Sequence, residues 1–269
     1  MSQSSKEEKK PVLVTGVIPF DETVSMRPAR NLYDHLTYQM RSNDLINTEE
    51  RRKIRKIGYS IKRYNGESLS ERLNNFERKV TKAYAEILNE KKVEEVDKFL
   101  SEYVKDFIWD LMTEKYKEGI EGVKGEYYTT MWSVLPSEFL KYLTSEDHLD
   151  LDDFQGLELE TRENEEGEIV YTGRRKRVMD LEERGRFKEN VEENLEKSNY
   201  DPEWKVGIAD SRADPLLDIV ENPYLYVPGG INQIEEEESD IKTNEGNGLS
   251  VIESWEKFFE EIKNSLDNS

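Results

Sequence analysis

The longest periodic feature of this sequence is a pair of apolar stripes between residues 69 and 111. In both stripes apolar residues recur at spacings of four and three, which is the repeat of one helix face. The first stripe consists of Leu69, Leu73, Phe76, Val80, Ala83 and Ile87, and the second of Val93, Val96, Leu100, Val104, Phe107 and Leu111. The phase shifts at residues 89–92. The pattern therefore predicts an antiparallel helical hairpin as the folding core, with one long helix that contains a stutter as the alternative.

Cap pairs mark the start of three predicted helices. In a capping box, a Ser, Thr or Asn side chain and a Glu three residues later bond each other's backbone amides. The pairs are Asn47 with Glu50, Ser68 with Glu71, and Ser250 with Glu253. The Asn47 pair precedes a helical pattern at 48–64, and further helical patterns cover residues 32–40, 126–135, 137–143 and 180–197.

Strand signals are few. Residues 12–18 form a β-branched run between two prolines, which predicts one short strand or an extended arm. Residues 157–161 and 168–172 alternate apolar and polar about a turn at 165–167, which indicates a β-hairpin. The Pro-rich stretch 200–230 predicts an irregular segment. The expected fold class is mainly α with a minor β-hairpin, α+β at the margin, with a helical hairpin core and extended arms.

The composition contains little material for a core. Hydrophobic residues make up 35% and charged residues 36% of the 269 residues. This balance predicts a multi-lobed chain in which some segments become ordered on a partner. The expected organisation is a disordered tail at 1–10, a mainly helical body at 11–230 with a hairpin near 157–172, an acidic flexible linker at 231–249, and an amphipathic docking helix at 250–269.

Charge and cysteine content exclude several classes of function. The formal charge of −20 opposes nonspecific binding of nucleic acid by the chain as a whole. The absence of cysteine excludes disulfides, thiol catalysis and Cys-based metal sites. The first ten residues lack the apolar core of a signal peptide, and no run approaches the roughly 18 apolar residues of a membrane span. We expect a cytoplasmic protein, or a part of a particle assembled there, that contacts no membrane.

The candidate catalytic groups do not form a recognised motif. The two histidines, His35 and His148, are far apart in the sequence. The acidic loop at 146–153 surrounds His148 with aspartates that could hold a cation, but it departs from the EF-hand pattern, and a solvated loop is the simpler interpretation. A nuclease hypothesis would combine Glu158, Glu160 and Glu168 with the basic run Arg174, Arg175, Lys176 and Arg177. We expect no catalytic residue, cofactor or metal site.

A basic helix at residues 51–63 contrasts with the acidic background. Its cations surround an isoleucine stripe, as in a helix whose outer face contacts phosphates. The candidate phosphate-contacting residues are Arg51, Arg52, Lys53, Arg55 and Lys56. The alternative is that these cations pair with acids of the same chain or of a neighbouring copy.

The predicted C-terminal helix is the strongest candidate for an interaction. Its apolar stripe is rich in aromatic residues and follows the predicted linker, which is typical of a helix that lies in a groove. The candidate partner-binding residues are Trp255, Phe258, Phe259 and Ile262. The groove could belong to the same chain or to another subunit.

These features favour a non-enzymatic structural or adaptor component of a larger assembly, with a protein partner or a homo-oligomer. Virion and other particle proteins have a similar combination of extended arms, helices and flexible linkers. The alternative is a nucleic-acid-associated protein that uses the helix at 51–63. A metal-dependent, nuclease-like enzyme is the third hypothesis.

Overall fold

The computed structural model describes residues 10–18, 28–60, 69–179, 200–209, 214, 216–226 and 249–267. The chain divides into two compact units. Unit 1 is formed by residues 1–16, 115–130 and 184–269, and unit 2 by residues 17–114 and 131–183. Most of the predicted tail, nearly all of the predicted linker, the helix predicted at 180–197 and the cap residue Ser68 lie outside the described residues; Lys10, the last residue of the predicted tail, begins β1.

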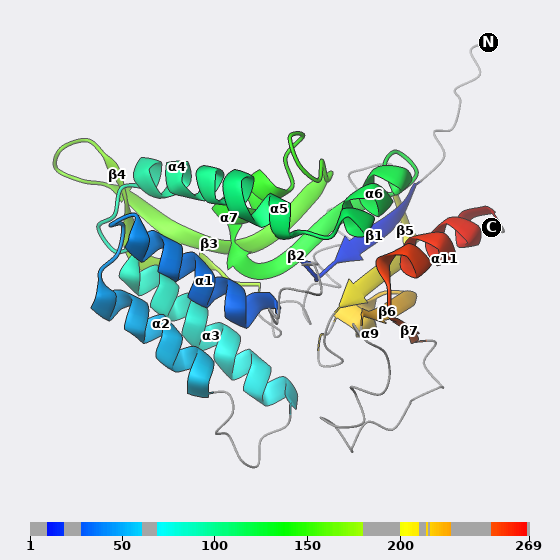
Figure 1. Ribbon diagram of the computed structural model, residues 1–269, viewed down its shortest axis with the longest axis horizontal. Helices are drawn as coiled ribbons and strands as arrows, with labels where there is room; N and C mark the ends of the chain where they lie inside the picture. Colours follow the sequence, from blue (N-terminus) through cyan, green and yellow to red (C-terminus); the bar gives the residue numbers. More distant parts are fainter. Residues whose placement is uncertain are drawn as a thin grey trace, which may run out of the picture. The chain divides into compact units, whose positions relative to one another are not determined.

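Helices and strands are mixed along the chain (Figure 1). The helices are α1 Pro28–Ser42, α2 Thr48–Ser60, α3 Leu69–Ile87, α4 Val93–Tyr103, the π-helix η2 Val104–Ile108, α5 Trp109–Leu111, α6 Glu114–Val123, α7 Ser137–Leu143, α9 Leu216–Ile219 and α11 Trp255–Asp267. The strands are β1 Lys10–Thr15, β2 Tyr128–Pro136, β3 Asp153–Glu163, β4 Ile169–Arg177, β5 Tyr200–Ala209, β6 Asn222–Tyr226 and β7 Ser250–Ile252.

The strands belong to a seven-stranded sheet in the order β4-β3-β2-β1-β5-β6-β7. Strands β3 and β4 pair antiparallel, whereas β1, β5, β6 and β7 pair parallel in succession. The expected fold class is therefore wrong: the chain has a mixed α/β sheet, and is not mainly α with a minor hairpin. The error has a physical cause, because parallel strands pair with segments far away in the sequence and leave no hairpin signal.

Two segments account for most of this error. Residues 126–135, predicted as a helix, contain β2, whose run Tyr-Thr-Thr-Met-Trp-Ser-Val-Leu is buried along nearly its whole length. Such a run has neither helical nor alternating periodicity, so its pattern does not distinguish a buried strand from a buried helix. The segment predicted to be irregular, 200–230, contains β5 and β6. The helix predicted at 137–143 is confirmed as α7.

In unit 2 the two periodic stripes form helices but not a helical hairpin core. Helix α3 packs against α2 and β4, while α4 packs against α7 and β4. Helices α1, α2 and α3 lie side by side (Figure 1). The predicted cap of α2 is confirmed, because Asn47 Oδ1 accepts the N–H groups of Glu49 at 2.8 Å and Glu50 at 3.0 Å. Glu50 Oε2 in turn accepts the Asn47 N–H at 2.7 Å.

The turn between α3 and α4 covers the edge strand β4. The N–H of Glu90 donates to the carbonyl of Tyr171 at 2.9 Å, and the N–H of Tyr171 donates to the carbonyl of Lys91 at 3.0 Å. Open edge strands template aggregation, so proteins commonly cover them. The β3–β4 hairpin is thus joined to the helices of its own unit.

In unit 1 the short parallel strands carry an aromatic layer beneath helix α11. Tyr224 of β6 contacts Phe258, and Tyr226 stacks on Trp255 with ring centroids 4.4 Å apart. Helix α11 begins later than predicted, because Ser250–Ile252 form β7. Its first turn is capped by Ser254, whose Oγ accepts the Lys257 N–H at 3.3 Å, and the predicted pair Ser250 with Glu253 is wrong.

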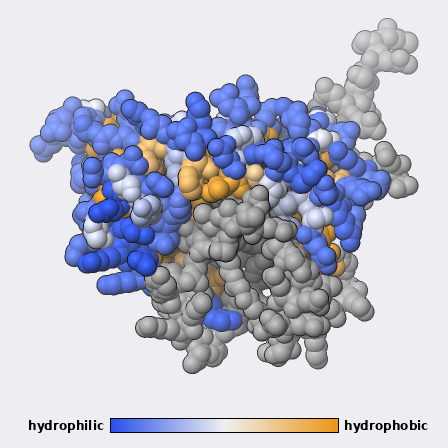
Figure 2. All heavy atoms as spheres, viewed as in Figure 1, coloured by the Kyte–Doolittle hydropathy of each residue, from blue (hydrophilic) through white to orange (hydrophobic). Residues whose placement is uncertain are grey.

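The charged residues lie largely on the surface. Figure 2 shows that the described residues in view are mostly hydrophilic, with apolar atoms gathered in a few places. Among the described residues, none of the helices has both the length and the apolar character that crossing a membrane requires.

Glycines on α6 give a direct test of how α11 is seated. A Cβ on Gly119 would overlap the ring of Phe259, whereas a Cβ on Gly122 would meet the flexible end of Lys263. We expect Gly119→Ala to lower the free energy of unfolding by about 1–3 kcal/mol, the usual cost of overpacking. Gly122→Ala should be neutral or should gain up to about 1 kcal/mol, since Ala is the better helix former. Denaturant unfolding of the two variants measures both values, and equal effects would contradict this packing.

Candidate active site

The carboxyl ends of β1 and β5 lie side by side in unit 1. Thr15 pairs with Ile208 in the parallel register, and the N–H of Gly16 donates to the Ile208 carbonyl at 2.9 Å. In the strand order, β2 lies on one side of β1 and β5 on the other, so the chain builds the sheet outward from β1 in both directions. Open α/β sheets bind ligands outside the carboxyl ends of their strands at such a switch point.

A buried carboxylate faces this point. Asp214 follows β5 and is 7% exposed. Its Oδ1 accepts the N–H of Leu216 at 3.0 Å, which fixes the side chain at the start of α9. Its Oδ2 lies 3.6 Å from the position that a Cβ on Gly16 would occupy. The backbone at the end of β1 therefore meets a carboxylate oriented by a hydrogen bond.

Gly16, at the end of β1, leaves this end of the sheet without a side chain. Because the residue has no side chain, it provides no nucleophile of its own. A Cβ there would lie at ordinary contact distance, 3.5 Å from the Ile208 carbonyl oxygen and 3.6 Å from a methyl group of Leu216. Glycine at this position lets another group approach the backbone closely, beside Asp214.

A buried tyrosine holds the last residue of β1. The hydroxyl of Tyr116, on α6, donates to Thr15 Oγ1 at 3.2 Å. Burial raises the pKa of Tyr116, so its hydroxyl keeps its proton at neutral pH. Thr15 itself is 2% exposed. The residue before Gly16 is thus fixed through its side chain as well as through the sheet.

Neither the scan of protein-family models nor the search of curated proteins found a match. Solved structures do match. A protein of unknown function from Bordetella pertussis Tohama I aligns with a TM-score of 0.60 at 15% identity, over 91% of this chain and 98% of that chain. A substrate-bound phosphoserine phosphatase aligns with a TM-score of 0.55 at 18% identity, over 96% and 99% of the respective chains. Cytosolic 5′-nucleotidase IIIB, bound to cytidine, aligns with a TM-score of 0.54 at 9% identity, over 96% and 88%.

The chain shares its Rossmann-like α/β fold with structures described as a phosphoserine phosphatase and as a HAD-family hydrolase. At these identities the similarity shows the fold alone. The expected function, a non-enzymatic structural, adaptor or virion component, is nevertheless contradicted, because the structures that share this fold include phosphoserine phosphatases and a 5′-nucleotidase. The expectation that the chain is not an enzyme is contradicted on the same ground.

One signal for this site was present in the sequence but was not used. The apolar run Val206–Ala209 is followed by a segment that contains Asp210 and Asp214. A short buried strand followed by acids predicts polar groups at the end of a parallel sheet. We read the segment instead as irregular, with Asp214 only as the start of a short helix. Gly16 carried no comparable signal.

The predicted partner-binding residues of α11 are buried within their own unit. Trp255, Phe258, Phe259 and Ile262 are each at most 4% exposed. Trp255 and Phe259 both contact the ring of Tyr116, at centroid distances of 4.8 and 5.9 Å. Of the two alternatives considered for this helix, the structure places it on its own chain.

The predicted phosphate-contacting residues lie on α2 in unit 2. Arg51 approaches Asp34 at 3.6 Å and covers the ring of Tyr38 at 4.7 Å, so it is engaged within its unit. The other four, Arg52, Lys53, Arg55 and Lys56, are exposed. Contact of this helix with nucleic acid stays a prediction.

The carboxylates of the nuclease hypothesis are not gathered into a site. Glu158 pairs with Lys176 at 3.2 Å and with Arg177 at 3.6 Å. Glu168 pairs with Lys92 at 2.7 Å. Within the described residues, no group of three or more acids and histidines could hold a metal, and this includes the loop at 146–153.

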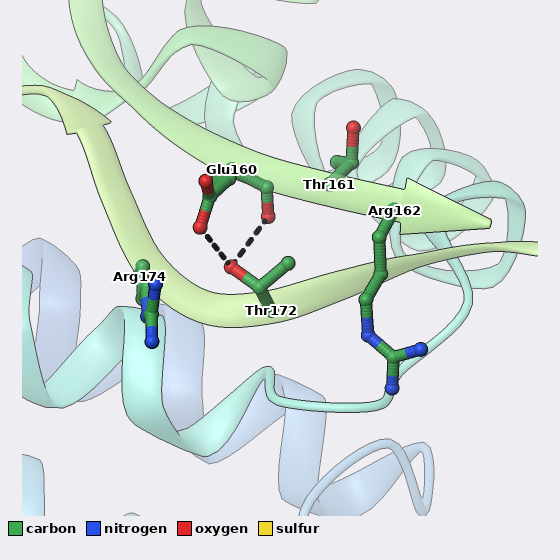
Figure 3. Close-up of a pocket in the computed structure, with 5 residues that line it drawn as sticks. All are labelled: Glu160, Thr161, Arg162, Thr172 and Arg174. Atoms are coloured by element: carbon green, nitrogen blue, oxygen red, sulfur yellow. Dashed lines mark hydrogen bonds between the residues drawn. The ribbon is translucent and has the colours of Figure 1, made fainter. Parts of the chain in front are cut away.

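Glu160 lies instead in an open polar pocket of about 390 Å³ on the β3–β4 hairpin. Figure 3 shows its carboxylate and carbonyl both bonded to the Thr172 hydroxyl, at 2.8 and 3.3 Å. Arg162 on the same hairpin reaches both oxygens of Glu90 at 2.7 Å. Arg174 completes the lining. Glu160, the one acid of this lining, is thus bonded to Thr172, and Arg162 is bonded to Glu90.

The two histidines have different neighbours. His148 contacts Trp109, while His35 Nδ1 lies 2.7 Å from the Tyr103 hydroxyl. The imidazole of His35 also stacks on Phe107, on the π-helix η2, at 4.3 Å. Burial raises the pKa of Tyr103, so the phenol keeps its proton at neutral pH.

This contact predicts a pH dependence of stability. Burial lowers the pKa of His35 below its usual 6.5, and the Asp34 carboxylate opposes this shift by a smaller amount. The unfolded chain therefore binds more protons than the folded chain between the two pKa values. The contribution of His35 is present above pH 6.5 and is lost as the pH falls through the lowered pKa. We expect His35→Gln to remove this part of the pH dependence in denaturant unfolding between pH 5 and 7. Identical pH profiles for both proteins would contradict it.

The placement of α11 predicts how truncating its anchors acts. Replacing Trp255 and Phe259 by Ala should each cost roughly 3–5 kcal/mol, because both rings are buried. If the helix packs only on its own chain, the melting temperature falls while the mass in light scattering stays the same. A lower mass with an unchanged melting temperature would place the helix in an interface between copies.

Proposed function

We propose that the protein hydrolyses a phosphate monoester at the carboxyl ends of β1 and β5. The observation that carries the proposal is the buried carboxylate of Asp214, which is held by Leu216 and faces Gly16. Its place at the strand ends of an α/β sheet is where such folds bind ligands. The fold is shared with structures described as phosphoserine phosphatase and 5′-nucleotidase, whose names have phosphate monoesters in common as substrates.

The residues present favour water as the attacking group. Gly16 has no side chain, and Thr15 is buried with its hydroxyl bonded to Tyr116. Hydrolysis then proceeds by attack of a water oxygen on phosphorus, breakage of the ester P–O bond and departure of the alcohol with a proton. Asp214 is placed to accept the proton of the attacking water. Such proton transfer contributes typically about 10²- to 10⁴-fold to a rate.

The described residues do not by themselves form a cation site, because they contain no group of three or more acids and histidines that could hold a metal. Mg²⁺ is usually bound by one or two carboxylates together with the substrate's phosphate oxygens. Asp214, as the base for the attacking water, would not hold such a cation at the same time.

Phosphate release from a panel of esters tests the proposal. The full chain is incubated with p-nitrophenyl phosphate, phosphoserine and nucleoside 5′-monophosphates, with Mg²⁺ and with EDTA. We expect Asp214→Asn to reduce the rate at least about 10²-fold. Asparagine caps helices as well as aspartate does, so the turn into α9 should persist. The control is Glu253→Gln, an exposed acid of the same unit, which should leave the rate unchanged.

Two outcomes would overturn the proposal. The first is a wild-type chain that releases no phosphate from the whole panel, even at enzyme concentrations equal to the substrate. The second is equal turnover by the Asp214→Asn variant and the wild type. Binding of an ester without its hydrolysis would count with the first outcome.

A further inference from the structure

Tyr116 connects three parts of unit 1. Its hydroxyl bonds Thr15 at the end of β1, at 3.2 Å. Its ring packs edge-on against Trp255, with centroids 4.8 Å apart at 78°, and against Phe259 at 5.9 Å and 64°. The residue is fully buried. The phenol is therefore held by helix α11 on one side while it bonds the sheet on the other.

Close packing leaves this ring little freedom. Gly119 lies one turn further along α6, and the ring of Phe259 occupies the space that a side chain there would need. Phe259 is thus pressed against α6 beside Tyr116. A ring enclosed by a helix backbone and two aromatic neighbours keeps its orientation, so the direction of the Tyr116 hydroxyl is set by packing.

The bond reaches the backbone next to the proposed site. Thr15 directly precedes Gly16, whose N–H is bonded to Ile208 and whose Cα faces Asp214. A strand end held only by backbone bonds frays more easily than one that is also tied through a side chain. Moving Gly16 would change the space between the strand end and the carboxylate.

We propose that Tyr116 is a positioning residue for the site at the ends of β1 and β5. It holds Thr15, and through Thr15 it fixes Gly16 opposite Asp214; this inference rests on the function proposed above. Its orientation comes from the aromatic anchors of α11, so the C-terminal helix contributes to the geometry of the site without touching it. Small displacements of reacting groups lower rates strongly, which makes such a tie useful.

Tyr116→Phe removes the hydroxyl and keeps the ring. We expect kcat to fall about threefold to tenfold, the effect of one hydrogen bond, with KM nearly unchanged. We also expect faster hydrogen exchange at the Gly16 amide, measured by NMR. The matched control is Tyr127→Phe, which removes another buried hydroxyl of unit 1, bonded to the Ile262 carbonyl at 3.0 Å. The control should lose comparable stability while kcat and the exchange at Gly16 stay at wild-type values.

Variants of Thr15 complete the test. Thr15→Ser retains the hydroxyl and should keep wild-type kcat, whereas Thr15→Val should match Tyr116→Phe. If the two residues act through one bond, the double variant Tyr116→Phe with Thr15→Val should lose no more than either single variant.

The outcomes separate this inference from the proposed function. A wild-type chain without phosphatase activity refutes the proposed function, and with it any positioning role in that reaction. If the rate of hydrogen exchange at the Gly16 amide is the same in Tyr116→Phe as in the wild type, Tyr116 does not hold the end of β1. This conclusion would not depend on the activity. In an active wild type, equal losses of kcat in Tyr116→Phe and Tyr127→Phe would reduce Tyr116 to a general structural role.

Discussion

The parallel pairing of β1 with β5 is the constraint on which the described part of unit 1 depends. It aligns Thr15 with Ile208, and the next backbone bond places Gly16 at the strand end. Strand β5 in turn admits α9 closely, because a Cβ on Gly207 would lie 3.3 Å from Leu216 of α9 and 2.9 Å from Val220, which follows this helix. The short approach of α9 is what brings Asp214 to the end of β1. The carboxylate and the glycine that faces it belong to segments about two hundred residues apart in the sequence, and this pairing brings them together.

The aromatic residues near the C-terminus explain how a chain so rich in charge forms a core. A helix as short as α11 is marginal in water by itself, so its order must come from packing. Trp255 and Phe258 bury their rings against β6, while Phe259 fills the groove left by Gly119 on α6. The aromatic stripe of this helix indicated that it must pack into a groove, and its rings are indeed buried. The groove belongs to the same unit, so the feature that favoured an assembly protein is a core contact.

The sequence predicted local elements far better than their partners. Helices α2, α3 and α7 were predicted from periodicity and caps, and the Asn47 cap has the expected bonds. Residues 153–177 form the antiparallel hairpin that local alternation and a turn indicated. Strands β2, β5, β6 and β7 were missed, since a buried or very short strand has no pattern of its own and its bonds go to distant segments. The candidate site was missed with them, because it exists only where β1 ends beside the missed strand β5.

The sequence by itself determined the charge, the lack of thiol chemistry and most of the helices, because these depend on residue type or on contacts a few positions apart. It also determined that Trp255, Phe258 and Phe259 must be covered, since their area is too apolar for water. Only the tertiary structure decided what covers them, and only it brought Asp214 to Gly16. Both facts depend on pairings between segments far apart in the chain, and the free energy of such pairings is a property of the packed fold that local spacing does not record.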